Sequence, residues 1–145
     1  NVGKLIKYAL AHDLVEVYAG DTWFYASHAN KKVYLAKLKK EEKSRLRLAK
    51  EFSEFPELHR LLYEYHRRKD KESKFIYALD KLLPIFNIYS DRGRMWRKSK
   101  VTLRMLFESK IDKVKPVPII YDYFSQIIKM LKGKEKKLFG TKTLD

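Results

Sequence analysis

The chain has 145 residues, with 33 Lys and Arg against 18 Asp and Glu, which gives a net charge of +15. A chain of this length with 45% hydrophobic residues can form one folded domain with a buried core, which argues against intrinsic disorder. It has no Cys, so disulfides and thiolate metal sites are excluded, and we expect a cytoplasmic protein. No apolar run reaches the roughly 20 residues of a membrane span, and the positive charge favours an anionic ligand.

Apolar residues recur at helical spacing through most of the chain, so we expect an all-α bundle of about six helices within residues 1–133. The expected helices cover residues 5–17, 40–55, 56–70, 71–88, 99–114 and 119–131. Pro84 predicts a kink or an early end in the fourth of these helices, and Gly133 ends the last. We expect a loop pair or irregular structure over residues 21–38, and a basic, flexible tail over residues 134–145.

A crowded polar segment lies at the end of the first expected helix. His12 and Asp13 place an imidazole nitrogen beside a carboxylate, which suits a divalent metal ion. On a helix, Glu16 would share the face of His12, because it follows four residues later. Gly20 would end that helix, and Asp21 comes directly after it. A solvated helix surface rarely carries so many carboxylates beside an imidazole and between apolar residues, so the segment is interpreted as a functional site.

A second segment, residues 72–82, carries Asp80 and Lys81 on another expected helix. Together the two segments resemble the signatures of the HD-domain metal-dependent phosphohydrolases, in the same order and at a similar separation. The most similar branch is that of the bacterial 5′-deoxynucleotidases and their eukaryotic HD-domain-containing relatives. The resemblance covers about residues 1–90. It implies an HD-type helical bundle that holds a divalent metal ion between two His and two Asp.

The resemblance assigns three of the four metal ligands to His12, Asp13 and Asp80, with Mn, Co, Mg, Fe, Ni or Zn as the metal ion. In the family, the first His lies on a helix upstream of the His-Asp pair, but no His precedes His12 in this chain. We expect that the domain is truncated at its N-terminus and lacks its first helices. The alternative is a chain that has lost one ligand and holds metal poorly. The other histidines are not expected to replace the absent ligand; they are His28, His59 and His66.

The resemblance also assigns roles in the reaction. Glu16 would accept a proton from the metal-activated water, and Asp21 would contact or protonate the leaving sugar oxygen. Lys74 and Lys81 are candidates to bind the phosphate, because both lie near Asp80 in the sequence. The plainer alternatives are a surface carboxylate for Glu16, a turn or N-cap residue for Asp21, and solvated side chains for both lysines.

Other branches of the family fit less well. Hydrolases of guanosine alarmones show a Glu-Asp pair where this chain has Glu16 and Val17. Cyclic-nucleotide phosphodiesterases need more His ligands than this chain supplies, and the Gly-Tyr-Pro signature of cyclic dinucleotide enzymes does not occur. We therefore expect phosphate removal from a nucleotide, in particular a deoxynucleoside 5′-monophosphate. We expect no membrane partner, and related proteins suggest a homodimer.

The alternative function is a degenerate HD fold that binds nucleic acid or a protein partner without turnover. The charge of +15 and the absent His favour it. Trp96 lies among basic residues that resemble a nucleic-acid-binding patch with a stacking aromatic ring; they are Arg92, Arg94, Arg97 and Lys98. The plainer interpretation of this segment is a basic loop around a core Trp.

Overall fold

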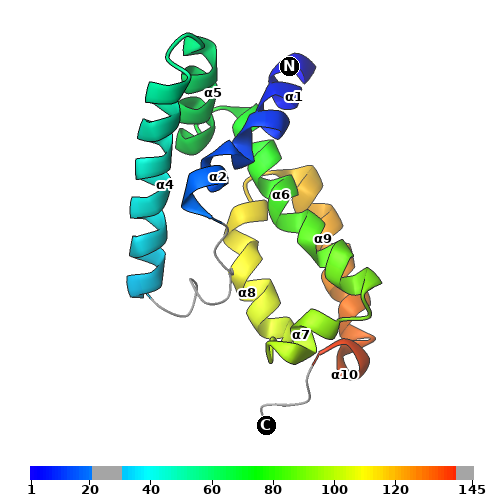
Figure 1. Ribbon diagram of the computed structural model, residues 1–145. Helices are drawn as coiled ribbons and strands as arrows, with labels where there is room; N and C mark the ends of the chain where they lie inside the picture. Colours follow the sequence, from blue (N-terminus) through cyan, green and yellow to red (C-terminus); the bar gives the residue numbers. More distant parts are fainter. Residues whose placement is uncertain (21–30, 140–145) are drawn as a thin grey trace. The chain divides into compact units, whose positions relative to one another are not determined.

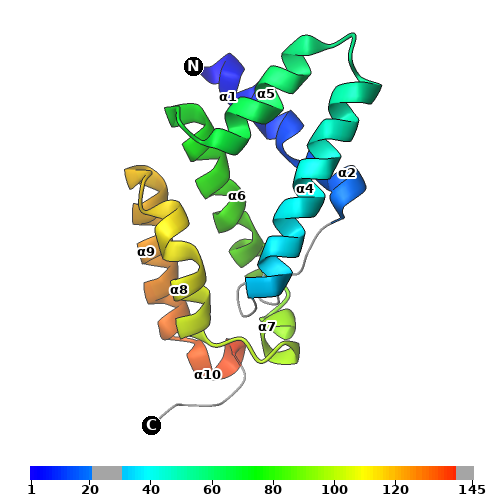
Figure 2. The same ribbon diagram turned by 90° about the vertical axis from the view of Figure 1, so that its left-hand side faces the viewer.

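The computed structural model describes residues 1–20 and 31–139, which are helical with short connections and contain no strand (Figures 1 and 2). The chain falls into two compact units, Asn1–Ser73 and Lys74–Asp145, and each is described by itself. Six helices of the described part have ten or more residues, which confirms the expected all-α architecture. None of the described helices combines the length and the apolar character that crossing a membrane requires.

The first unit packs the N-terminal segment against a helical hairpin. Its elements are α1 (Val2–Ala11), the 3₁₀ turn η1 (His12–Val15), α2 (Glu16–Ala19), α4 (Lys31–Glu51), α5 (Pro56–Arg67) and the first turn of α6 (Lys71–Ser90). Helix α1 lies beside α5, and α2 lies beside α4 (Figure 1). α1 begins where the Asn1 side chain accepts a hydrogen bond from the Lys4 N–H at 3.1 Å. Pro56 starts α5, where its missing N–H costs nothing.

The apolar core of this unit lies where η1 meets α4 and α5. Its buried and partly buried members are Ala11, Leu14, Val15, Leu48, Leu58 and Leu62. These residues come from four elements, namely α1, η1, α4 and α5, and α1 continues into η1 without a break. The core therefore fixes the chain around His12 by packing on both of its sides.

A polar cluster ties α1 to α5 and to the start of α6. We call it the Tyr8 cluster, and it consists of Lys4, Tyr8, Glu64 and Asp70. Tyr8 is fully buried, and its hydroxyl lies 3.0 Å from a carboxylate oxygen of Glu64 and 3.0 Å from one of Asp70. The Lys4 Nζ lies 3.2 Å from Glu64 and 3.5 Å from Asp70. Asp70 also accepts the Ser73 N–H at 2.8 Å, as an N-cap of α6 does.

The second unit is built from the rest of α6 and the helices that follow. These are α7 (Arg94–Lys98), α8 (Leu103–Val114), α9 (Pro118–Lys132) and α10 (Glu135–Leu138). Helices α8 and α9 lie side by side, joined by a short turn (Figure 2). Thr102 caps α8 by accepting the Met105 N–H at 3.1 Å, and Pro118 starts α9. The core of the unit includes Ile85, Leu106, Val114, Phe124 and Leu131.

At the far end of this unit, α7 and α10 close on each other around an aromatic stack. The rings of Trp96 and Phe139 are 4.6 Å apart between centroids and nearly parallel, at 11°. Gly93 precedes α7 with a φ of 72°, and a Cβ there would lie 2.3 Å from the Leu138 carbonyl oxygen. Only Gly allows both this backbone conformation and this close approach.

Two boundaries in the first half of the chain differ from the sequence expectations. The single helix expected over residues 5–17 ends at Ala11 and continues as η1 and then α2. Helix α4 begins at Lys31 instead of residue 40, so the expectation of irregular structure is wrong for residues 31–38. The start of α4 is rich in Lys, Leu and Ala, which favour helix without producing a clear apolar period.

Two differences also appear in the second half. α6 does not end early at Pro84 but continues to Ser90. Leu82 and Ile85 are buried on both sides of the proline, and their packing holds the helix together across it. Within the tail expected over residues 134–145, Glu135–Leu138 forms α10, with Leu138 and Phe139 buried.

Candidate functional site

His12 stands at the junction of α1 and η1, where its ring is held in one orientation. The Nδ1 atom lies 2.8 Å from the Ala9 carbonyl oxygen. Because a carbonyl oxygen can only accept, Nδ1 carries the proton and Nε2 is the nitrogen that can bind a metal ion. The ring also meets Tyr65 edge-on, with 5.6 Å between centroids. A backbone carbonyl on the second nitrogen is how metal-binding histidines are commonly oriented.

The Nε2 atom of His12 faces the carboxylate of Asp13. The distance from Nε2 to Oδ1 is 3.2 Å. Two donor atoms bound at right angles to one divalent ion, each at about 2.1 Å, are about 3.0 Å apart. The pair therefore fits two neighbouring ligands of one ion. The Asp13 side chain is 64% exposed, which leaves the carboxylate accessible to an ion and its further ligands.

The α-helical spacing behind the expected shared face of His12 and Glu16 does not apply to this segment. The residues from His12 to Val15 form η1, and a 3₁₀ helix completes a turn in three residues, so four ideal steps would carry Glu16 about 120° past His12. This tighter turn sets Leu14 and Val15 against the core residue Leu48. Gly20 ends α2 with a φ of 71° and donates its N–H to the Glu16 carbonyl at 2.8 Å, as predicted.

Side chains of α4 anchor the segment that carries Glu16. Ser44 is 2% exposed and donates its hydroxyl to the Val15 carbonyl oxygen at 2.5 Å. Tyr18 donates to the carboxylate of Glu51, and the Arg47 guanidinium lies 3.8 Å from the centroid of the Tyr18 ring. These contacts fix both ends of α2 on α4 and so determine where Glu16 begins its helix.

The remaining predicted ligand, Asp80, lies on α6 in the second unit. Its side chain is 29% exposed, and one carboxylate oxygen lies 2.5 Å from the Nζ of Lys81. Lys81 therefore turns toward Asp80 despite being adjacent to it in the helix. Lys74 is exposed. The roles assigned to these three residues stay predictions.

Lys110 on α8 is a residue that sequence reasoning missed. It is only 6% exposed, whereas lysine is almost never buried without a charged neighbour. Burial and, to a smaller extent, the positive charge of Lys81 lower the pKa of Lys110, while Asp80 raises it, and the net result is a pKa of about 8. We call Asp80, Lys81 and Lys110 the Asp80 cluster. All three residues belong to the second unit.

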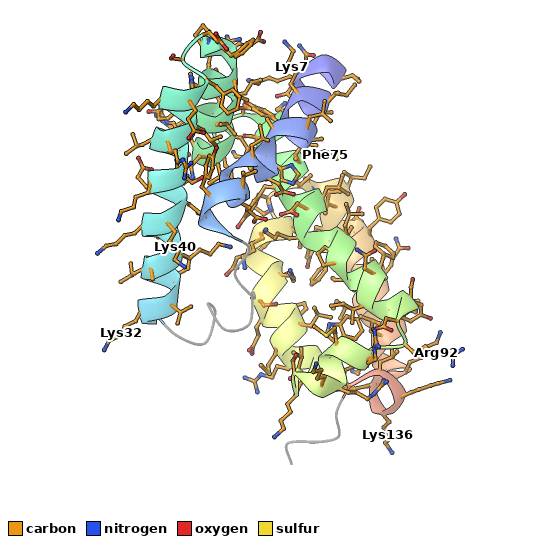
Figure 3. All side chains as sticks on the ribbon, in the orientation of Figure 1. Lys7, Lys32, Lys40, Phe75, Arg92 and Lys136 are labelled. Atoms are coloured by element: carbon orange, nitrogen blue, oxygen red, sulfur yellow. The ribbon has the colours of Figure 1, made fainter. Side chains whose placement is uncertain are left out.

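The other basic residues explain most of the net charge in a simpler way. Lys32 on α4, Arg92 in the turn before α7 and Lys136 on α10 extend from the surface and are exposed (Figure 3). Such side chains keep their charge in water at little cost. Lys110 differs from them because it is buried.

No group of three or more His, Asp or Glu side chains is arranged to hold a metal ion within residues 1–20 and 31–139. His12 and Asp13 form a pair, and the assignment of Asp80 to the same ion stays a prediction. Asp21 and His28 lie outside the described residues. His59 contacts the Phe52 carbonyl oxygen at 2.9 Å, which is a role in the fold.

His66 is partly buried beside Arg45 and has a role in the fold. Its Nδ1 lies 3.2 Å from a guanidinium nitrogen of Arg45. Burial lowers the pKa of His66, and the charges of Arg45 and Arg68 add to this effect. A neutral imidazole that faces a guanidinium is poorly placed to bind a cation, which agrees with the expectation that His66 does not replace the absent ligand.

The basic segment around Trp96 does not present a stacking aromatic. Trp96 is 1% exposed and packs on Phe139, so it is a core residue, as the plainer interpretation holds. Arg97 donates to the Lys137 carbonyl oxygen at 3.0 Å, and Arg94 pairs with Asp91 at 3.0 Å. A base cannot stack on an indole that is covered in this way.

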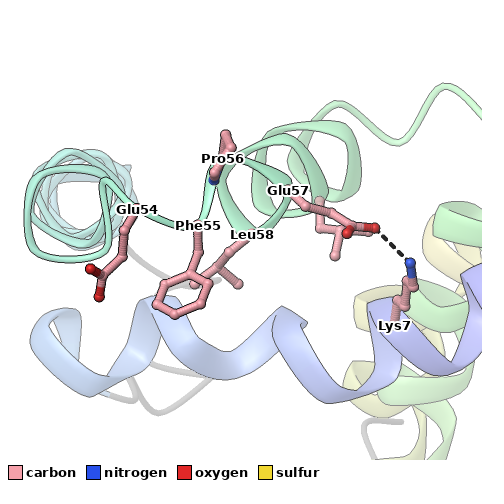
Figure 4. A pocket seen from close by; sticks show the side chains of 7 residues that line it. Lys7, Glu54, Phe55, Pro56, Glu57 and Leu58 are labelled. Atoms are coloured by element: carbon pink, nitrogen blue, oxygen red, sulfur yellow. Dashed lines mark hydrogen bonds and ion pairs between the residues drawn. The ribbon is translucent and has the colours of Figure 1, made fainter.

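A shallow pocket of about 440 Å³ lies between α1 and the start of α5 (Figure 4). Phe55 and Leu58 line it, and the ion pair of Lys7 with Glu57, at 2.6 Å, borders it. None of the predicted site residues lines this pocket. Its mostly apolar wall lacks the convergent charges that a phosphate ester would need.

Comparison with known proteins gives one match. The sequence model of a family described as the HD domain matches residues 1–118, which is most of the chain and includes both His12 and Asp80. No curated protein and no solved structure matches the chain.

Proposed function

This chain belongs to the HD-domain family, and on that premise we propose that it is a metal-dependent phosphohydrolase that releases phosphate from deoxynucleoside 5′-monophosphates. The observation that carries the proposal is the geometry of the His12–Asp13 pair. The Ala9 carbonyl oxygen fixes the protonated Nδ1, and Nε2 lies 3.2 Å from the Asp13 carboxylate. Imidazole and carboxylate together form a donor set that first-row divalent ions accept.

In this proposal His12 and Asp13 hold the metal ion, with Asp80 as a further ligand. A divalent ion held there would lower the pKa of a bound water and would polarise a phosphoryl oxygen. The water oxygen attacks phosphorus, and the bond from phosphorus to the 5′ oxygen of the sugar breaks. Glu16 accepts the proton that the water loses, and Asp21 donates a proton to the leaving oxygen. Lys81 and Lys74 neutralise phosphate charge.

The test is an assay of phosphate release by the purified protein with Mn²⁺, Co²⁺ or Mg²⁺. The substrates are the deoxynucleoside 5′-monophosphates, with ribonucleotides and simple sugar phosphates for comparison. Asp13→Ala, Glu16→Ala and Asp80→Ala should each abolish most of the activity. Asp122→Ala is the matched control, since it removes an exposed carboxylate of α9. Activity that survives both Glu16→Ala and Asp80→Ala would contradict the assigned site.

The same preparation tests the non-catalytic alternative. Metal-loaded protein that hydrolyses none of these substrates, but binds nucleic acid with an affinity that falls steeply with salt, would support a degenerate HD fold. Because Trp96 is buried, such binding would have to depend on the exposed basic side chains alone.

A further inference from the structure

Two basic segments of the second unit meet where α7 and α10 contact each other. Residues 91–100 and 134–137 hold eight Lys and Arg against two acidic residues. The Arg97 guanidinium joins the segments, because it donates to the Arg92 carbonyl oxygen at 2.5 Å and to the Lys137 carbonyl oxygen at 3.0 Å. We call the eight basic side chains the α7–α10 surface; they are Arg92, Arg94, Arg97, Lys98, Lys100, Lys134, Lys136 and Lys137.

The packing beneath this surface holds it in place. All eight residues are exposed. On α7, the side chains of Arg94, Arg97 and Lys98 lie within about 100° of one another around the helix axis, and Trp96 lies on the opposite side. Trp96 stacks on Phe139, which follows α10 directly. The same core contact that joins the two helices therefore leaves their basic side chains facing outward.

Little of the positive charge is neutralised by acidic neighbours. Arg94 pairs with Asp91 at 3.0 Å. The partners of Arg97 are carbonyl oxygens, and Lys134 lies 2.6 Å from the Tyr89 hydroxyl, so these partners carry no charge. Within residues 1–20 and 31–139, Arg94 is the one member of the surface that forms an ion pair with a carboxylate. The like charges repel one another, and a bound polyanion would relieve this repulsion.

Two members of the surface occupy backbone positions that glycine commonly fills. The φ angle is 53° at Arg92 and 52° at Lys100, in the left-handed region. In both cases the N–H of the next residue donates to the carbonyl oxygen five residues back, at 2.9 Å after α6 and 2.8 Å after α7, as in a Schellman motif. Glycine would adopt these conformations without strain. Both positions therefore combine a strained backbone with an exposed cation, which favours a role for the two charges.

We propose that the α7–α10 surface binds the phosphate backbone of double-stranded nucleic acid. Lys and Arg neutralise backbone phosphates and release the counterions that surround a duplex. Binding there would not involve the metal site, because none of the predicted site residues belongs to the surface. Contacts to the backbone alone carry no base readout, so we expect little dependence on nucleotide sequence.

Other anionic partners fit this surface less well. None of the large hydrophobic side chains that are exposed in the described part of the chain lies within residues 91–100 or 134–137. A bilayer surface needs such side chains to insert, and the centre of a protein interface is depleted in charged residues. A single strand gains affinity when its bases stack on aromatic rings, but Trp96 and Phe139 are buried. A duplex presents its phosphates without requiring either feature.

A purely structural role predicts a different set of effects. Cations beyond the C-terminal end of a helix interact favourably with its dipole, and Arg92, Lys100 and Lys134 follow α6, α7 and α9. If this were their whole role, neutral replacements would lower stability and leave duplex binding unchanged. If the surface binds a duplex, affinity falls, while stability stays the same or rises because fewer like charges repel one another.

The experiment measures fluorescence anisotropy of a short labelled DNA duplex of mixed sequence, in EDTA so that no metal ion contributes. The wild type should bind with a Kd of about 1–100 µM and lose affinity steeply between about 50 and 200 mM salt. A triple variant combines Arg92→Gln, Lys98→Gln and Lys136→Gln (Figure 3). It should raise the Kd by about 10-fold or more at low salt and lower the slope of log Kd against log salt by about 2 to 3.

A matched control makes the same change in net charge in the first unit. It combines Lys39→Gln, Lys40→Gln and Lys43→Gln, which replace exposed lysines of α4. Its Kd should stay within about threefold of the wild type. Equal losses in the two triple variants would show that binding follows net charge alone and would overturn the proposal. Tighter binding of the wild type to a single strand or to anionic phosphatidylserine vesicles would overturn it as well.

A single variant covers the case in which the triple variant does not fold. Lys100→Gly removes one charge and keeps the left-handed backbone, so the denaturation midpoint should stay the same or rise. The salt slope of duplex binding should fall by about 1. A lower midpoint with unchanged duplex binding would assign Lys100 to the fold and contradict the proposal. Because binding is measured without metal, the result does not depend on phosphohydrolase activity.

Discussion

The Tyr8 cluster and the Asp80 cluster are both partly buried groups of charged side chains, but their charges are balanced differently. In the first unit, Lys4 and the N-terminus of α6 offset two carboxylates, and Tyr8 shares its hydroxyl between them. In the second unit, Lys81 lies 2.5 Å from a carboxylate oxygen of Asp80, and the charges of both residues act on the buried Lys110. A cluster that is balanced by the chain itself stabilises the fold. In the Asp80 cluster, the buried ammonium group of Lys110 costs folding stability, because burial disfavours its charged form.

The largest expected effect is on activity in the second unit. Asp80→Ala should lower phosphate release by about 100- to 1,000-fold, because it removes a proposed metal ligand next to the reacting group. Steady-state kinetics with saturating Mn²⁺ measures the effect, and Asp122→Ala should match the wild type. A loss smaller than about threefold would remove Asp80 from the site.

The second largest expected effect is a loss of folding stability when the Tyr8 cluster of the first unit is changed. Tyr8→Phe should lower the free energy of unfolding by about 2 kcal/mol, since it removes a buried hydroxyl that donates to carboxylates and leaves them less satisfied. Urea denaturation at pH 7 measures the change. Affinity for phosphate should stay the same in this variant, and a loss of affinity would mean that the Tyr8 cluster also contributes to ligand binding.

Acid should weaken the Tyr8 cluster. Hydrogen bonds from Lys4 and Tyr8 lower the pKa of Glu64. Burial raises the pKa of Asp70, but the Ser73 N–H, Tyr8 and Lys4 outweigh it, so the pKa is lowered overall. Groups with depressed pKa values contribute stability above their unfolded values, near pH 4, and lose it as the pH falls through their folded values. The difference in unfolding free energy between wild type and Tyr8→Phe should therefore shrink by about half or more between pH 7 and pH 3. An equal difference at both pH values would contradict this account.

The smallest expected effect is the change in denaturation midpoint when one lysine is replaced in each cluster. Lys4→Met and Lys110→Met remove the same charge and introduce the same side chain. Lys4→Met should lower the denaturation midpoint, because two carboxylates lose their nearest cation. Lys110→Met should leave the midpoint unchanged or raise it slightly. Thermal or urea denaturation of both variants in parallel gives the answer, and a lower midpoint for Lys110→Met alone would reverse the comparison.

Much of the helical architecture could be predicted from local signals. Pro56 and Pro118 begin α5 and α9, at or next to the expected starts at residues 56 and 119, because the effect of a proline depends on the backbone nearby. Helix α8 begins at Leu103, after the Thr102 cap, instead of at the expected residue 99. Gly20 likewise marks the end of α2. The sequence predicts only the second half of helix α4, since its charged first half has little apolar periodicity.

The candidate site was predictable in its residue types but less so in its geometry. The pairing of His12 with Asp13 could be read from their adjacency, and the structure adds the Ala9 contact that selects Nε2. The position of Glu16 in the fold depends on the 3₁₀ turn η1, and this turn packs against α4. The spacing of Lys110 with Leu106 and Val114 is compatible with a buried stripe, but lysine is so commonly exposed that this spacing alone does not predict its burial.

The sequence by itself determined the all-α class, the HD-domain family and the identity of the polar residues at the candidate site. These follow from side-chain type and spacing along the chain, which need no knowledge of distant contacts. Tertiary structure alone decided that Trp96 is a core residue, that Tyr8 joins two carboxylates, and that Lys110 is buried beside the charges of α6. Burial and electrostatic environment depend on residues far away in the sequence, so local pattern cannot supply them.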